Sequence, residues 1–236
     1  YRFDGGLALY GAAGVDRIDG AEQTSHAAGS AGASYRIDDR WSISGTASKG
    51  VFAATARSLL ADVEIRTLSA TAAFTPIASI AIRVTAQGDR FTDENNRRLL
   101  SGYARWAIPL KRPRVGVSWS VREFSCDTLG TGYFCPNAYL ANLAGVDVSD
   151  RIGTRFGWNA ALSLGWQVVG IRPGSRDTDT VQGYHAAGTW DFRPGITGEI
   201  YGGWTNLALA SGSGFASTEF GARIRFRLGA PGGTNR

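Results

Sequence analysis

Residues 217–228, the last extended stretch of the chain, alternate strictly between apolar and polar side chains. The apolar positions are Phe220, Ala222, Ile224, Phe226 and Leu228. Three arginines lie among the positions between them. A period of two is typical of a β-strand whose two faces meet different surroundings. An apolar face toward lipid and arginines toward a wet interior is the pattern of an outer-membrane barrel.

The same stretch also carries the order polar-x-Gly-x-x-apolar-x-apolar. This order resembles the assembly signal on the final strand of outer-membrane barrels, and its matching residues are Glu219, Gly221, Ile224 and Phe226. The resemblance implies recognition by the barrel-assembly machinery. We therefore expect that machinery and the outer-membrane lipid as partners.

The rest of the chain repeats this alternation in about twelve segments of roughly ten residues, each bounded by turn residues. In the clearest segment, Leu162 and Leu164 lie on one face, and Asn159 and Gln167 on the other. Near Arg66 the alternation slips, which predicts a bulge, with Arg66 on the polar face. The expected strands are 3–12, 27–37, 41–48, 59–74, 80–89, 100–108, 114–122, 138–148, 155–168, 180–192, 196–206 and 217–228.

The connections between these segments alternate between tight turns and a second set that includes longer loops. The tight set is 38–40, 76–79, 109–113, 149–151 and 193–195, and the other set is 14–24, 49–58, 92–96, 125–137, 170–179 and 208–215. Short periplasmic turns and longer extracellular loops are the rule for outer-membrane barrels. We therefore expect the tight set and the N-terminus on the periplasmic side of a bacterial outer membrane.

These patterns predict one all-β domain over residues 1–228, a closed antiparallel transmembrane β-barrel, with a short periplasmic tail at 229–236. We expect about 12 strands, within a range that extends to about 16. No apolar run approaches the roughly 20 residues of a transmembrane helix. The absence of methionine indicates a segment of a longer precursor. Tryptophans near the ends of the segments fit the aromatic girdles of a membrane barrel, and a soluble antiparallel barrel is the alternative.

Arginine predominates on the polar faces of the segments. The residues predicted to line a lumen are Arg83, Tyr103, Arg105, Arg114, Arg122, Arg155, Glu199, Tyr201, Arg223, Arg225 and Arg227. Such a lining selects anions or binds sugar hydroxyl groups. In the alternative, opposite charges pair across neighbouring strands and fill the interior.

Other classes of function find little support in the sequence. The net charge is +5, but no basic helix or recognition motif indicates nucleic acid. His26 and His185 lie on polar faces, and nothing fixes a nucleophile beside either of them. The histidines and cysteines have no metal-ligand spacing. We expect no catalysis, no cofactor and no metal.

The two cysteines, Cys126 and Cys135, flank a glycine-containing loop. A chain that passes through an oxidising periplasm is expected to join them in a disulfide. Two free thiols are the alternative.

Two sequence elements near this loop resemble a known family. Residues 132–140, Gly-Tyr-Phe-Cys-Pro-Asn-Ala-Tyr-Leu, resemble the Gly-Tyr-Phe-Ser-Pro-x-x-Tyr element in the barrel of cellulose-type exopolysaccharide exporters. One hairpin earlier, residues 89–98 resemble the Phe-Ser-Asp-Gly-Asn-x-Arg element of those exporters. Cys135 replaces the serine of the first element, and Glu94 or Asn95 replaces the glycine of the second. The family joins a periplasmic tetratricopeptide scaffold to a C-terminal barrel that passes the polymer.

The resemblance implies a channel that exports an exopolysaccharide, as the barrel of a longer protein. Two other hypotheses remain open. One is a small-solute porin that prefers anions, in which the arginines act as an electrostatic filter. The other is an anchor or receptor barrel without transport.

Overall fold

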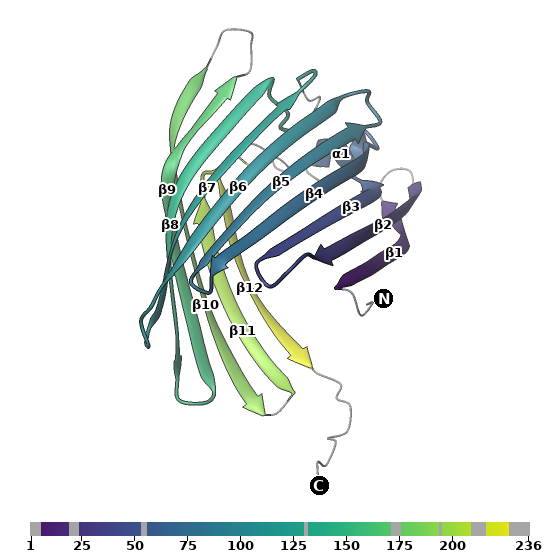
Figure 1. Cartoon of the computed structure of the whole chain (residues 1–236). Coiled ribbons are helices and arrows are strands. Elements are labelled where there is room, and N and C mark those ends of the chain that lie inside the picture. The colour runs from purple at the N-terminus through teal and green to yellow at the C-terminus, as the bar shows by residue number, and fades with distance from the viewer. Residues whose placement is uncertain are drawn as a thin grey trace.

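The structure, a computed structural model, describes residues 6–18, 24–52, 56–129, 132–170, 176–193, 195–208 and 216–226. It consists almost entirely of antiparallel β-strands, each paired with the next in chain order (Figure 1). The strands are β1 (Leu7–Ile18), β2 (Thr24–Arg36), β3 (Trp41–Val51), β4 (Glu64–Ile77), β5 (Ile80–Phe91), β6 (Asn96–Ile108), β7 (Arg114–Cys126), β8 (Ala138–Ile152), β9 (Phe156–Gly170), β10 (Asp177–Arg193), β11 (Ile196–Thr205) and β12 (Ser217–Phe226). The prediction of an all-β antiparallel fold with 12 strands is therefore confirmed.

The sheet curls into a tall wall, with β1 and β12 as its edge strands (Figure 1). β1 begins and β12 ends at the tight-turn end, where Leu7 pairs with Tyr35 and Phe226 pairs with Ile196. The two edge strands diverge toward the other end in Figure 1. Within the described ranges no ladder joins β12 to β1. Closure of the sheet into a barrel thus stays a prediction.

The structure differs from the sequence-based expectation at four places. Residues 56–60 form the short helix α1 (Ala56–Leu60), so that β4 begins only at Glu64. The register shift between β4 and β5 lies between Phe74 and Ile77 and not near Arg66. Pro76 lies within this step, and proline has no N–H group to donate to the ladder.

The turn between β8 and β9 is also displaced. The expected turn at 149–151 belongs to β8, and the chain reverses at residues 153–155. Gly153 has φ +63°, a conformation that glycine adopts without steric cost. β1 and β2 also extend into the expected loop 14–24, as far as the pair Ile18 and Thr24. Glycine and alanine are frequent in this part of β1 and β2, so the alternation that predicts a strand is weak there.

One face of the sheet is apolar and open to the surroundings. Leu162 is 51% exposed, and its ladder partners Val146 and Tyr184 lie on the same face. Near the tight turns Trp41 stacks on Phe74 with ring centroids 4.2 Å apart. At the height of Leu162, Tyr184 stacks on Trp204 of β11. Aromatic side chains therefore lie along the exposed apolar face, as in transmembrane barrels.

The other face, which we call the polar face, lies inside the curve. Its side chains meet across strands that are not neighbours, as Arg105 of β6 and Asp147 of β8 do. Side chains from strands that are not neighbours approach one another on the concave side of a curled sheet, so the polar face is the concave face. None of the helices in the described ranges is long and apolar enough to span a bilayer.

Candidate lumen and its loop cap

The registers place most of the predicted lumen residues together on the polar face. Arg105 is opposite Ser118, and the alternation carries the same face through every strand to Arg223, opposite Glu199. The members of the predicted set on this face are Arg83, Tyr103, Arg105, Arg114, Arg122, Glu199, Tyr201, Arg223 and Arg225. Arg155 lies in the turn before β9, and Arg227 lies outside the described residues. Arg66 lies on the apolar face, contrary to expectation, because no bulge reverses the alternation there.

Arg105 forms a bidentate ion pair that crosses a whole strand. Its Nε and one terminal nitrogen donate to Asp147 over 2.9 and 2.6 Å. Gly116 of β7 lies beneath the pair, where a Cβ atom would meet both side chains. Glycine at this position lets β6 and β8 interact. The alternation in residues 138–148 does not define the two faces of the strand, so the sequence alone does not indicate Asp147 as a partner of Arg105.

Glu199 pairs with both arginines of β12. Arg223 donates to its carboxylate over 2.9 and 2.6 Å, and Arg225 over 3.2 Å. The guanidinium of Arg223 also lies 5.5 Å from the ring centre of Tyr201, a cation–π distance. The single carboxylate of β11 thus offsets one of the two positive charges of this pair.

Three other arginines of the polar face are left without such partners. No ion pair involves Arg83, Arg114 or Arg122 among the residues that the structure describes. The polar face therefore combines paired charges, which make it hydrophilic, with cations that are available to a solute.

A hollow of about 510 Å³ lies on the polar face between β6 and β12. Glycines and alanines such as Gly145, Ala161 and Gly203 leave this space unfilled. Groups that form hydrogen bonds surround it. They are Tyr103, Asp147, Ser163, His185, Thr205 and Glu219. A wall of hydroxyl, carboxylate, imidazole and phenol groups suits a polyhydroxylated solute.

At the loop end the connections after β3, β5, β7 and β11 gather over the polar face in a compact cluster, which we call the cap. Its apolar part is buried, and its members are Phe52, Val63, Phe91, Phe124, Cys126, Tyr133, Cys135, Tyr139, Ala141, Val169 and Ala208. The rings of Phe124 and Tyr139 lie 4.5 Å apart, and Phe134 contacts both edge-on. This cluster is the best-packed part of the described structure.

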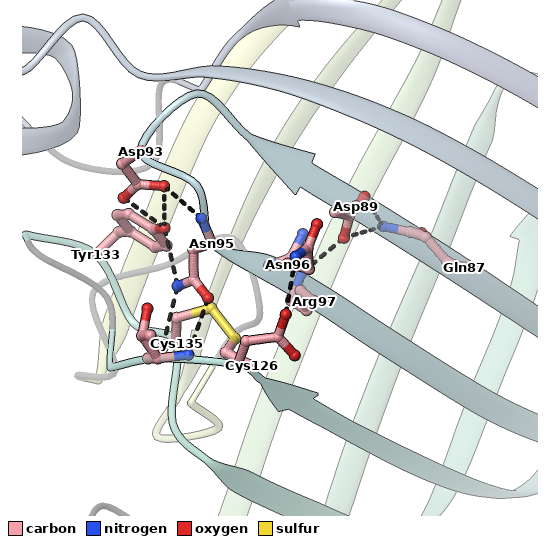
Figure 2. The surroundings of a disulfide bond; sticks show 11 residues. Gln87, Asp89, Asp93, Asn95, Asn96, Arg97, Cys126, Tyr133 and Cys135 are labelled. Carbon is pink, nitrogen blue, oxygen red and sulfur yellow. Dashed lines mark hydrogen bonds and ion pairs between the residues drawn. A yellow bond between two sulfur atoms is a disulfide. The ribbon is translucent and has the colours of Figure 1, made fainter.

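The two family-like sequence elements meet in the cap (Figure 2). Tyr133 donates from its hydroxyl to Asp93 over 2.9 Å and accepts from Asn95. Asn95 also exchanges two hydrogen bonds with the backbone of Thr128. Burial raises the pKa of the Tyr133 phenol well above its usual value. Residues 89–98 and 132–140 thus form one unit.

The predicted disulfide is present and closes this unit. Cys126 at the end of β7 is bonded to Cys135 in the loop that follows, with 5.7 Å between their Cα atoms. The backbone N–H of Cys126 also donates to the carbonyl of Pro136. Tyr133 and Phe134 are thereby fixed against β5, β6 and β7.

Beneath the disulfide lies a buried ion pair. Nε of Arg97 donates to Asp89 over 2.7 Å, and the two side chains are 4% and 0% exposed. Gln87 and Thr67 donate to the other lone pairs of Asp89. Arg97 lies over the rings of Phe52 and Phe91. The last residue of the Phe-Thr-Asp-Glu-Asn-Asn-Arg element is therefore a structural anchor.

Glu94 lies in the turn between β5 and β6, at the loop end of the sheet, with φ +67°. This left-handed conformation is costly for residues other than glycine. Of Glu94 and Asn95, the two residues that could replace the glycine of the family element, only Glu94 has the positive φ that glycine adopts readily.

A second charged cluster lies at the loop end of β2, β3 and β4. Nδ1 of His26 contacts Glu64 over 2.8 Å, and Lys49 contacts the other oxygen of Glu64 over 2.9 Å. Nε2 of His26 lies 2.7 Å from Asp62, without hydrogen-bond geometry. No group of three acidic, histidine or cysteine side chains that could hold a metal ion occurs in the described ranges.

Comparison with protein-family models and with curated proteins finds no match for this sequence. Among solved structures, a "Bacterial polysaccharide outer membrane secretin" is similar, with a TM-score of 0.72 and 15% identity. The match covers 94% of this chain and 76% of that chain.

Two further solved structures are similar over 94% of this chain. One is the "KdgM porin in complex with disordered oligogalacturonate", with a TM-score of 0.43, 7% identity and 99% of that chain covered. The other is the translocator domain of the autotransporter NalP from Neisseria meningitidis, with a TM-score of 0.45, 13% identity and 87% covered. These two scores are too low to say more about the fold. On the strength of the secretin match, the chain shares the fold of that outer-membrane protein over most of its length.

Proposed function

We propose that this protein is an outer-membrane channel through which a polysaccharide is exported. The observation that carries the proposal is the hollow on the polar face, with Tyr103, His185 and Glu219 among its hydrogen-bonding groups. Sugar rings present hydroxyl groups to such a lining and apolar faces to a tyrosine. The similarity in fold to a polysaccharide secretin supports this choice of substrate.

The paired charges suit passage better than tight binding. Arg105, Arg223 and Arg225 are engaged by carboxylates on their own wall, so these three groups hydrate the surface but bind a passing solute less strongly than unpaired arginines would. A polymer that moves along a pore needs many weak contacts, because a deep site would hold it in place.

In this proposal the tight turns and the N-terminus face the periplasm, and the cap lies at the extracellular exit. The wall closes into a barrel in the membrane, since an open strand edge in lipid leaves backbone groups unsatisfied at several kcal/mol each. We infer that further strands of the same protein lie between β1 and β12. The divergence of these edges and the quarter of the secretin structure that is not matched support this inference.

Disulfide crosslinking distinguishes a barrel with further strands between β1 and β12 from one in which these two strands pair directly. Leu9→Cys combined with Ile224→Cys should form no disulfide in the intact protein if further strands intervene. The control pair, Leu9→Cys with Ala33→Cys, lies on a described ladder and should crosslink. Rapid crosslinking of the first pair would establish direct closure.

The transport proposal is tested by reconstitution of the protein in a planar bilayer. We expect ion conductance that a soluble polysaccharide blocks from the tight-turn side. The block should weaken when Tyr103 and His185 are both replaced by alanine, and not when Tyr35, which lies on the apolar face outside the hollow, is replaced. Conductance without any polymer block would contradict export.

The second candidate is a porin that prefers small anions, and the arginines without ion pairs favour it. Replacement of Arg83 and Arg122 by glutamine should then lower anion selectivity more than the same change at Arg223 and Arg225. The latter pair shares the carboxylate of Glu199, which already offsets one of its two charges. A barrel that passes no ions, with or without an intact cap, would leave the anchor or receptor hypothesis.

A further inference from the structure

Three arginines cluster on the apolar face at the loop end of the wall. Arg66 of β4 lies directly opposite Arg90 of β5, and Arg98 of β6 is opposite Gly88, two residues from Arg90. All three side chains are exposed. Leu68, opposite Gly88, begins the exposed apolar band directly beside them.

Among the described residues, no carboxylate forms an ion pair with this arginine cluster. Lys49, opposite Arg66, extends the row of cations but is bound to Glu64. No ion pair of Arg66, Arg90 or Arg98 is found in the described parts of the chain, although Glu123 of β7 lies on the same face. Like charges placed directly opposite in a sheet destabilise it. An anion from outside the protein would remove this repulsion.

The shape beside the arginines indicates which kind of anion fits. A cleft of about 1010 Å³ lies over β2 to β6, and its floor includes Ala31, Ala47, Leu68 and Gly88. The position that a Cβ atom of Gly88 would take has no atom within 4 Å. A free phosphate ion would use only the cationic rim. A lipid would use both the rim and the apolar floor.

We propose that this cleft binds a phosphorylated lipid of the outer leaflet. Its phosphate groups lie between Arg66, Arg90 and Arg98, since guanidinium groups bind phosphate with paired hydrogen bonds. An acyl chain lies over Leu68 and Gly88, in line with the apolar band. The proposal rests on the outer-membrane orientation given above, but it does not depend on transport.

The test uses purified protein in phosphatidylcholine nanodiscs with or without bisphosphorylated lipid A. Native mass spectrometry should detect retained lipid A on the wild-type protein. The triple variant Arg66→Gln, Arg90→Gln and Arg98→Gln should retain at least tenfold less. A control triple at the tight-turn end, Arg40→Gln, Lys111→Gln and Arg193→Gln, changes the charge equally and should retain as much as the wild type.

Thermal unfolding gives a second readout that a merely misfolded variant would not produce. Without lipid A the loop-end triple should unfold at the same temperature as the wild type or higher, because like-charge repulsion has been removed. Lipid A should raise the unfolding temperature of the wild type only. Equal retention by both triples, or complete displacement of lipid A by equimolar inorganic phosphate, would overturn the proposal. A bilayer recording of the same triple should show unchanged conductance.

Discussion

The phenol of Tyr133 donates a 2.9 Å hydrogen bond to Asp93, although the two residues are 40 positions apart in the sequence. This bond connects the turn after β5 to the loop after β7, and Asn95 completes it from the other side. The cap therefore depends on a small polar centre as much as on its apolar rings.

Replacement of Tyr133 by phenylalanine should destabilise the protein by about 1–3 kcal/mol, because Asp93 and Asn95 lose a buried partner. Unfolding in detergent, followed by tryptophan fluorescence, measures the change. Tyr184→Phe serves as the control, since that side chain is exposed on the apolar face. Equal effects of the two substitutions would show that the hydroxyl of Tyr133 is not important.

The same hydroxyl should make the cap sensitive to alkaline pH. Burial raises the pKa of Tyr133 in the folded state, whereas an unfolded tyrosine ionises near pH 10. Its contribution to stability is complete below about pH 10 and is lost as the pH rises further. The difference in unfolding temperature between wild type and Tyr133→Phe should shrink between pH 9 and 11. A constant difference would contradict the assignment.

Glu94→Gly should stabilise the protein by roughly 0.5–1 kcal/mol, since the left-handed strain at this turn exceeds the entropic cost of glycine. Chemical unfolding measures the gain. Asp39→Gly, in a tight turn without positive φ, should instead lower stability slightly. A loss at residue 94 would mean that the glutamate side chain contributes more than the strain costs.

The ion pairs Asp89–Arg97 and Asp147–Arg105 should contribute differently to the free energy of unfolding. Asp89→Asn removes the buried carboxylate to which Arg97 donates and should cost about 3–5 kcal/mol. Asp147→Asn breaks the pair with Arg105, which is about a third exposed, and should cost less than about 1 kcal/mol. Comparable losses in urea unfolding would show that burial does not separate the two pairs.

Leu162→Arg tests the direction of the faces. An arginine in the middle of the lipid-facing band should cost about 2–4 kcal/mol on folding into vesicles. Asn159→Arg, on the polar face of the same strand, should cost far less. Similar penalties at the two positions would exclude the proposed orientation of β9.

The sequence predicted the strands well wherever large apolar residues alternate with polar ones. In β9 the order of Leu162, Leu164 and Trp166 left no ambiguity, because a one-residue slip would reverse every side chain. The first strands are rich in glycine and alanine, so their ends were predicted less well. In β4 the register shift lies around Pro76 and not near Arg66 as expected.

The site was predictable only in part. Period-two alternation placed Arg83 and Arg223 on one face, and spacing and compartment indicated the disulfide. The pairing of Arg105 with Asp147 depends on the register across three strands, which no local pattern contains. The contact between Tyr133 and Asp93 likewise joins the loops that follow two different strands, β7 and β5.

The cap has a consequence for how the chain assembles. Phe52, Phe91, Tyr133 and Ala208 come from the beginning, middle and end of the sequence, yet they share one buried cluster. Most of the wall must therefore have curled before the cluster can close. The cap becomes resistant to protease only at the end of assembly, so cleavage near Tyr133 would report wall segments that have inserted but not yet finished folding.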